Sequence, residues 1–514
     1  MSHESVEALP AGELLRRLRL LREEVSATAS ALLSKWNPYI TRSDFVPSAA
    51  NLASYLALRQ TDLRETQTHL MPWGLSSIGR CESHVLPALD SVIATLQAIS
   101  ARQSRQHAPS LSEFFRGDDL LEDAAARLLG SATDGRRVRI MVTFPTEAAN
   151  DYELVRELLE CGMNVARINC AHDSREAWQA MIDNVHAAEV ETGRTCKISM
   201  DLGGPKIRTQ GIGFKRKHVF HKGDVVLLVT DSPGRSRRFP YQVRCSLREV
   251  FDRARPGEAV WIDDGIIGAV IEDVNPEGLV LRLEHVRPDG ERIRPEKGIN
   301  FPDTTLDIPA LTEKDLEDLD FVSQNADLIG FSFVQTAEDV EQLQAELARR
   351  VHDKERLASI GIVAKIETKR AIANLPEIIV SAAGRQPLGV MIARGDLAVE
   401  IGFERLAEIQ EELLWICEAA HVPVIWATQV MENFVKEGVP TRSEVTDAAM
   451  AERAECVMLN KGDYVCDAVT VLSNVLIRME GHQFKKRAEL RALKSWPIEL
   501  VRPAQELTEA SAAD

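Results

Sequence analysis

Two short apolar runs, each ending in charged residues, decide how this chain is interpreted: Gly361-Ile-Val-Ala-Lys365-Ile-Glu367 and Gly389-Val-Met-Ile-Ala-Arg394-Gly395-Asp396. Such runs are typical of buried parallel strands. The carboxyl ends of the strands form the active face of a parallel barrel, so charges placed there indicate chemistry. Two carboxylates and an ammonium that meet there would hold a divalent metal beside an anionic substrate. The simpler alternative is an ion pair between Lys365 and Glu367 at the edge of a sheet.

Composition excludes several classes of protein. The 514 residues are too many for one simple core, so two or three domains are expected. The net charge of −17 argues against a nucleic-acid or anionic-membrane surface. Eight scattered cysteines without a CxxC pair predict buried thiols in a reducing compartment. Residues 1–7 lack the apolar stretch of a signal peptide, and no run is long enough to span a bilayer, so the sequence predicts a cytoplasmic protein.

Strand and helix patterns alternate through most of the chain, as in a parallel sheet built from βα units. Strands are expected to begin at residues 138, 164, 196, 328, 361, 389, 422 and 456, and eight βα units predict a TIM barrel. After the third strand, short β-rich runs separated by Gly, Pro and Asp predict a small inserted all-β domain. The predicted fold class is therefore α/β, with a helical region at 1–130, the barrel at 131–208 and 299–481, the insert at 209–298 and a fraying tail at 482–514.

The helical region shows no chemistry, and a role in packing or oligomerisation is expected for it. Cationic residues gather instead after the second and third barrel strands. Arg167 and Asn169 are two apart and therefore point to the same side, close to the barrel mouth. A guanidinium there suits a phosphate or a carboxylate, although Arg167 could also cap a neighbouring helix. Lys206 and Arg208 add two cations where Gly-Gly-Pro makes a tight exit from the barrel.

These residues and several other motifs resemble the pyruvate kinase family. The resemblance keeps the family's order over roughly residues 136 to 480, and its motifs are Met163–His172, Asp201–Thr209, Trp261–Gly265, Lys297–Pro302, Asp307–Asp315, Gly330–Val334, Ala364–Glu367, Met391–Leu397, Ala427–Gln429 and Pro440–Val445. It implies transfer of the phosphoryl group of phosphoenolpyruvate to ADP, giving pyruvate and ATP, a reaction of glycolysis.

The resemblance also implies roles for the residues at the barrel mouth. Glu367 and Asp396 would hold Mg²⁺ (or Mn²⁺), which bridges the substrate's carboxylate, enol oxygen and phosphoryl group. Arg167 and Lys365 would grip the phosphoryl group, and Lys365 would also stabilise the enolate left behind. Thr428 would lie near the carbon that is then protonated, through water. Catalysis of this kind consists of positioning and charge stabilisation.

The remaining implied contacts concern the substrate and the nucleotide. Gly395 would contribute to the substrate site beside its metal-binding neighbour. The inserted domain, carrying Asp264 and Lys297, would close over the nucleotide and exclude water. Arg208 would help to hold the phosphates.

The monovalent-cation site of the potassium-dependent members is altered. Asn169 and Asp201 match that site, but Ala171 and Leu202 replace two of its oxygen ligands. Lys206 stands where those members carry Glu, and its ammonium could supply the missing charge and balance Asp201. The resemblance with this departure predicts activity without K⁺; the alternative is a site that has decayed.

The nucleotide half of the site departs from the family in two loops, Leu459–Gly462 and Thr143–Thr146. The family's C-terminal α/β domain is also missing, so its usual regulation is not expected. These changes keep two alternatives open: a metal-dependent enzyme of pyruvate enolates, of the aldolase or decarboxylase type, without nucleotide use, and a non-catalytic protein that senses phosphoenolpyruvate. A homo-oligomer is expected.

Overall fold

A computed structural model describes residues 9–100, 108–133, 135–234, 236–485 and 487–488. The amino-terminal residues 1–7, which entered the argument about signal peptides, lie outside this range, as does most of the expected tail. The first part of that tail forms a small hairpin of β16 (Gln483–Phe484) and β17 (Arg487–Ala488). Within the described residues, no helix combines the length and the apolar character needed to cross a membrane.

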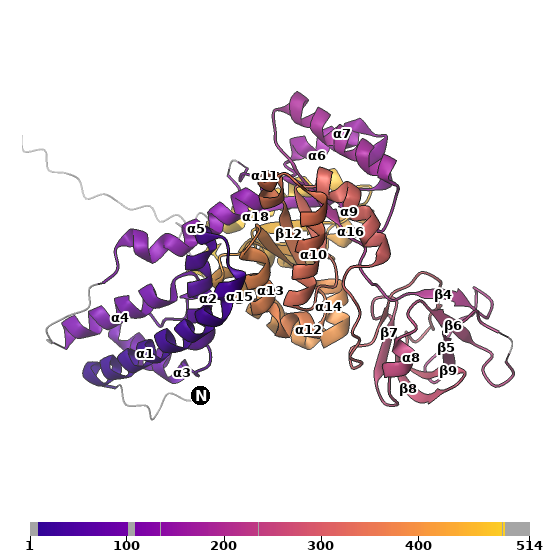
Figure 1. Cartoon of the computed structure of the whole chain (residues 1–514), viewed down its shortest axis with the longest axis horizontal. Helices are drawn as coiled ribbons and strands as arrows, with labels where there is room; N and C mark the ends of the chain where they lie inside the picture. The colour runs from indigo at the N-terminus through magenta and orange to yellow at the C-terminus, as the bar shows by residue number, and fades with distance from the viewer. Residues whose placement is uncertain (1–8, 101–107, 134, 235, 486, 489–514) are drawn as a thin grey trace, which may run out of the picture.

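The centre of the described molecule is a closed parallel barrel of eight strands, as the sequence predicted (Figure 1). Its strands follow one another around the barrel in the order β1-β15-β14-β13-β12-β11-β3-β2. Each observed strand begins within two residues of its predicted start; the strands are β1 (Arg139–Thr143), β2 (Val165–Asn169), β3 (Lys197–Asp201), β11 (Leu328–Phe331), β12 (Gly361–Ile366), β13 (Leu388–Ala393), β14 (Val424–Ala427) and β15 (Cys456–Leu459).

Helices surround the barrel, and many begin at a side-chain cap. Thr312, Thr336 and Thr441 each form a capping box with an acidic residue three positions later, which satisfies backbone groups at the helix start. The helices are α6 (Tyr152–Cys161), α7 (Arg175–Thr192), α9 (Glu313–Asn325), α10 (Ala337–Arg350), α11 (Lys354–Ser359), α12 (Lys369–Ala373), α13 (Leu375–Ala383), α14 (Arg394–Ile401), α15 (Phe403–Ala419), α16 (Glu432–Glu437), α17 (Arg442–Met450) and α18 (Val465–Glu480).

One boundary differs from the sequence-based interpretation. The apolar run that was read as a strand up to Asp396 ends at Ala393, and α14 begins directly at Arg394. Asp396 therefore lies in the first turn of a helix, where backbone N–H groups and the helix dipole favour a carboxylate.

The inserted domain leaves the barrel after β3 and returns before β11. Its strands form one mixed sheet in the order β10-β7-β8-β9-β5-β6-β4, with a separate apolar core around Phe220 and Val260. Figure 1 shows this domain at one end of the molecule, opposite the amino-terminal helices. Its elements are β4 (Thr209–Ile212), β5 (Val225–Val229), β6 (Gln242–Cys245), α8 (Val250–Arg253), β7 (Ala259–Ile262), β8 (Ile267–Asn275), β9 (Gly278–His285) and β10 (Ile299–Asn300).

The amino-terminal region is helical and packs against the barrel. Its main elements are α1 (Ala11–Trp36), α2 (Val46–Leu58), α3 (Arg64–Leu70), α4 (Val85–Ile99) and α5 (Leu111–Leu129), and α2 also contacts α15. The end of α5 inserts Leu128 and Leu129 into an apolar cluster with residues at the starts of barrel strands, such as Val165 and Leu328. This region packs against the barrel and closes the end opposite the strand C-termini. Packing or oligomerisation was expected for it, and oligomerisation stays a prediction.

Candidate active site

A cavity of about 370 Å³ opens at the barrel mouth formed by the carboxyl ends of the strands. This is the face on which barrel enzymes carry their active sites. The lining includes eight residues singled out from the sequence, namely Arg167, Asn169, Lys206, Arg208, Lys365, Glu367, Asp396 and Thr428. The fold thus brings together side chains that are more than 250 positions apart in the chain.

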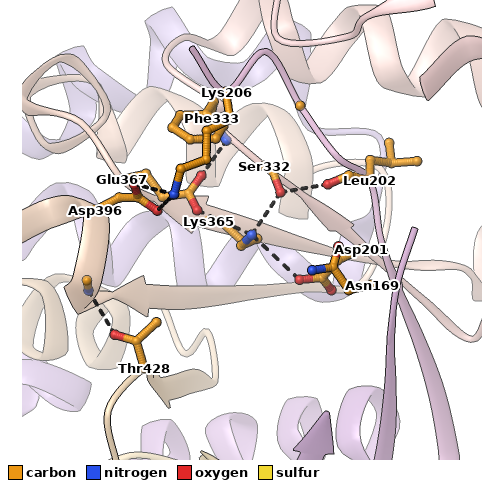
Figure 2. Close-up of polar contacts among 12 residues, drawn as sticks. Asn169, Asp201, Leu202, Lys206, Ser332, Phe333, Lys365, Glu367, Asp396 and Thr428 are labelled. Carbon is orange, nitrogen blue, oxygen red and sulfur yellow. Dashed lines mark hydrogen bonds and ion pairs between the residues drawn. The ribbon is translucent and has the colours of Figure 1, made fainter. Parts of the chain in front are cut away.

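Lys365 is the centre of the polar network in this cavity (Figure 2). Its Nζ donates to Ser332 Oγ at 2.8 Å and lies 3.2 Å from Glu367 Oε1 and 3.6 Å from Asp201 Oδ2. Ser332 Oγ in turn donates to the Leu202 carbonyl at 2.8 Å, which fixes its lone pairs toward the ammonium. The ion pair with Glu367 that the simpler interpretation proposed is therefore real, but it is one contact within a buried network at the barrel mouth.

Asp201 lies beneath the cavity and is fully buried. Its Oδ2 accepts a hydrogen bond from Arg167 Nε at 2.9 Å, and Arg167 Nη1 donates to Thr143 Oγ1 at 2.9 Å. Burial alone would raise the pKa of Asp201, but Arg167 and Lys365 hold it below its usual value. Asp201 is therefore an anion that orients two cations toward the cavity.

Glu367 and Asp396 are the carboxylates that could hold a divalent metal. Glu367 Oε2 accepts a hydrogen bond from the Phe333 backbone N–H at 2.6 Å, and both oxygens of Asp396 accept from Lys206 Nζ, at 2.9 and 3.2 Å. Burial raises the pKa of Glu367, and the negative charge of Asp396 adds to this shift. Conversely, Asp396 raises the pKa of Lys206 against the opposing effect of burial. A cation bound between the two carboxylates would offset the repulsion that Asp396 exerts on Glu367.

Two carboxylates are too few to bind a metal through protein ligands alone. They fit magnesium or manganese, whose coordination is completed by other ligands. Mg²⁺ is commonly bound by one or two carboxylates together with waters and substrate phosphates. Among the described residues, no group of three or more His, Cys, Asp or Glu side chains is placed to hold a metal ion. Lysine ammonium groups contact both carboxylates in this structure, Lys365 at Glu367 and Lys206 at Asp396.

Thr428 is held in a strained backbone conformation at the end of β14. Its φ is 65°, in the left-handed region that is unfavourable for a β-branched residue. Arg394 holds this turn, because its Nη2 donates to the Thr428 carbonyl at 2.6 Å and its Nε to the Ala427 carbonyl at 3.0 Å. Asp447 pairs with the same guanidinium. In this position Thr428 Oγ1 accepts a hydrogen bond from the Gly395 N–H at 2.8 Å.

The residues expected to bind the nucleotide are less closely gathered. Arg208 lines the cavity and donates to the Glu296 carbonyl at 3.1 Å. Asp264 of the inserted domain lies 3.6 Å from Lys206, whereas Lys297 pairs with Asp263 at 2.8 Å and is not part of the cavity lining. The structure therefore assembles the part of the site around Glu367 and Asp396, with the inserted domain beside it.

Sequence reasoning assigned no role to Ser332, Phe333 or Asp447. Ser332 and Phe333 lie within a motif that was recognised, but nothing in the sequence indicates that the hydroxyl contacts Lys365 or that the Phe333 N–H contacts Glu367. Asp447 is 53 positions from Arg394, on α17, and only the folded structure shows the pairing. The charge of Lys206 was expected to balance Asp201; in the structure Lys206 instead contacts Asp396 and Asp264.

Comparison with known proteins places the chain in a family. Residues 135–469 match the family described as "Pyruvate kinase, barrel domain", and the chain belongs to the pyruvate kinase family. It is 35% identical over 336 residues to pyruvate kinase 1 of Trypanosoma brucei brucei, which is 64% of each chain. It is 32% identical over 357 residues to the pyruvate kinase of Hypocrea jecorina, covering 68% of this chain and 64% of the relative. Identity to the human pyruvate kinase PKLR is 34% over 338 residues, 63% of this chain and 56% of the relative. The match thus spans less than two thirds of the length of these relatives.

Proposed function

We propose that this protein is a pyruvate kinase that transfers the phosphoryl group of phosphoenolpyruvate to ADP, in the cytoplasm, to give pyruvate and ATP. The observation that carries the proposal is the network around Lys365, which places an ammonium between two buried carboxylates beside Arg167 and Thr428. Phosphoryl transfer needs this kind of site, because catalysis depends on positioning and on stabilising charge.

The side chains of the cavity divide the work of the transfer. The bond between phosphorus and the enol oxygen of phosphoenolpyruvate breaks, and a terminal oxygen of ADP forms the new bond to phosphorus. Arg167 binds the moving phosphoryl group with the part of its guanidinium fork that does not face Asp201. Lys365 lies on the side of the enol oxygen and stabilises the enolate that remains. Ser332 orients this ammonium by accepting a hydrogen bond from it at 2.8 Å.

The enolate becomes pyruvate when its methylene carbon takes up a proton. We assign delivery of this proton to a water held by Thr428, whose hydroxyl is fixed by the Gly395 N–H. Glu367 and Asp396 would hold Mg²⁺ or Mn²⁺, and when bound this ion would neutralise the phosphoryl oxygens and the substrate's carboxylate. Lys365 and Lys206, which contact the two carboxylates in this structure, would then turn to the substrate.

The inserted domain would act as a lid over the nucleotide. Asp264 and Lys297 lie on this domain, and Arg208 on the linker that joins it to the barrel. Closure would bring Lys297 toward the phosphates and exclude water from the transfer. The assembly is proposed to be a homo-oligomer.

Lys206 is proposed to make K⁺ unnecessary. Its Nζ lies 2.9 Å from Asp396 and 3.6 Å from Asp264, so it adds a fixed positive charge beside the metal carboxylate. Asn169 remains at the cavity wall, while Asp201 is already neutralised by Arg167 and Lys365. The charge that a monovalent cation would supply is thus carried by the chain itself.

The proposal is tested by measuring pyruvate release from phosphoenolpyruvate with ADP and Mg²⁺, with and without K⁺. We expect turnover that is independent of K⁺ and that falls by about 100-fold or more in Lys365→Met, because a preorganised charge is lost. A strong requirement for K⁺ would contradict the role of Lys206. Release of pyruvate from oxaloacetate or from a 4-hydroxy-2-oxo acid, with no turnover of phosphoenolpyruvate, would favour an enolate enzyme of the decarboxylase or aldolase type without nucleotide use. That alternative draws support from the loops Thr143–Thr146 and Leu459–Gly462, whose residues depart from the family pattern. Binding of phosphoenolpyruvate without turnover would indicate a sensing protein.

A further inference from the structure

A second cavity, of about 420 Å³, lies between the barrel and the linkers that join the inserted domain to it. One wall is formed by both linkers, residues 205–207 and 299–308, and the opposite wall by the barrel segments at 368–370 and the end of α14. A volume in this range is typical of small-molecule sites. Because the walls belong to both sides of the hinge, a molecule bound here would contact both moving parts at once.

The lining combines an apolar wall with one poorly satisfied carboxylate. The apolar side chains are Ile207, Ile299, Phe301, Leu306, Ile308 and Phe333. Glu400 of α14 faces this wall, and its Oε1 accepts a long hydrogen bond of 3.4 Å from Asn300. This distance exceeds the usual range for a hydrogen bond of this type. Burial raises the pKa of Glu400 to about 7, as expected of a carboxylate with few compensating contacts.

The basic residues at the rim of the cavity are already paired. Lys369 contacts Asp303 at 3.5 Å and the Pro302 carbonyl at 3.1 Å, and Arg370 contacts Asp307 at 3.3 Å. An anionic ligand would have to displace these aspartates and would then face Glu400 across the cavity. A cationic ligand needs no such exchange: it can contact Glu400 directly, whereas Lys369, whose charge also acts on Glu400, is held by Asp303 and the Pro302 carbonyl.

Two residues separate this hinge cavity from the active-site cavity and line both, Lys206 and Phe333. Lys206 Nζ holds Asp396, and the Phe333 N–H holds Glu367 from a backbone with a φ of 56°. Asp396 and Glu400 also lie one turn apart on α14. The two residues that separate the cavities, Lys206 and Phe333, are therefore the ones that position the two proposed metal ligands.

We infer that the hinge cavity is a ligand site for a small apolar molecule carrying one primary ammonium group, bound by Glu400 and by the apolar wall. The ammonium replaces the long contact from Asn300, and the apolar body packs against Phe301 and Ile308. A bound molecule fixes the angle between the linkers and the barrel. It also changes the positions of Lys206 and Phe333, which line both cavities. The inference stands on geometry that is separate from the proposed phosphoryl transfer.

The test is calorimetric titration of the full-length protein with three indole probes that differ in the terminal group: tryptamine, the neutral tryptophol and the anionic indole-3-propionate. At a pH of about 8, where Glu400 is ionised, tryptamine should bind at least about tenfold more tightly than tryptophol. Glu400→Gln should reduce the affinity for tryptamine to that for tryptophol. Glu404→Gln makes the same change on an exposed part of α15 and should leave binding unchanged.

Hydrogen–deuterium exchange gives a second readout. Tryptamine should protect amides in 205–207 and 299–308 in the wild type but not in Glu400→Gln. Equal binding of all three probes, an affinity for tryptamine that is unchanged in Glu400→Gln, or no binding of tryptamine would each overturn the inference. Because both readouts measure binding, they judge the site even if the protein releases no pyruvate. A change in turnover with tryptamine would follow only where the proposed function also holds.

Discussion

Leu128 packs into the end of the barrel opposite the strand C-termini. It lies so close to two strand glycines that they have no room for a side chain. A Cβ at Gly361 would lie 2.4 Å from Leu128 Cδ1, and a Cβ at Gly389 would lie 2.6 Å from Cδ2. Gly361→Ala should therefore destabilise the barrel by about 1–3 kcal/mol through overpacking. Leu128 is 3% exposed, and Leu128→Ala should cost about 2–5 kcal/mol through the lost contacts and the cavity left behind. In the double variant the new methyl group occupies space that the leucine has vacated.

The double variant should therefore be less destabilised than the sum of the single changes, with a coupling of about 1–3 kcal/mol. Native-state hydrogen exchange of the amides in β12 and β13 measures this locally, which avoids assuming that so large a chain unfolds in one step. Gly389→Ala combined with Leu128→Ala is an independent repeat. Gly12→Ala, where nothing lies within 4 Å of the new methyl group, serves as the control and should cost nothing. Additive costs would show that α5 does not fill the barrel end in solution.

Three further changes test the site and the buried charges. Lys206→Met should raise the affinity for Mn²⁺ at least tenfold in the absence of substrate, as measured by electron paramagnetic resonance. The reason is that the ammonium 2.9 Å from Asp396 no longer competes with the metal for this carboxylate. Lys206→Arg keeps the charge and should not raise the affinity. Ser332→Ala should lower kcat about tenfold by releasing Lys365, and it should cost about 1–3 kcal/mol of stability because the Leu202 carbonyl loses its donor; Ser332→Thr should restore kcat. An unchanged kcat in Ser332→Ala would deny Ser332 a positioning role. Burial raises the pKa of Glu418 from 4.5 to about 7, so its contribution to stability is full below pH 4.5 and is lost as the pH rises through 7. Urea unfolding should show Glu418→Gln removing a decline on the order of 3 kcal/mol over that interval, and an unaltered pH dependence would contradict the assignment.

The barrel could be predicted from sequence because its strands are short apolar runs that alternate with helical segments. Two parts of the site could not. Arg394-Gly395-Asp396 continues an apolar run and was read as a strand end, but the chain turns into α14 at Arg394. The left-handed Thr428 backbone accepts a hydrogen bond from the Arg394 guanidinium, which reaches it from the neighbouring βα unit. Both features depend on tertiary contacts, and neither leaves a local pattern.

The position of α5 was equally hidden from sequence reasoning. An amphipathic helix with buried Leu121 and Leu128 indicates that it packs somewhere, but not against which surface. The position of α5 is indicated instead by glycines in the strands that it contacts. Gly361 and Gly389 lie at or near the starts of β12 and β13, two strands that are neighbours in the barrel. Glycine at a strand start is easily taken for a turn residue. Here it provides space for another side chain.

Under the proposed function, the charges of the site predict that the metal and the substrate bind together. Arg167, Lys365 and Lys206 each face a carboxylate in this structure, so the site is balanced as it stands. A divalent cation alone would meet two nearby ammonium groups, and a trianionic substrate alone would meet buried carboxylates. Together they bring charges that largely cancel, and each turns the lysines and carboxylates toward the other. Under the proposed function, the metal and phosphoenolpyruvate should therefore increase each other's affinity by the same factor, as linkage requires. Equal affinities for Mn²⁺ with and without the substrate would show that these ion pairs do not open on binding.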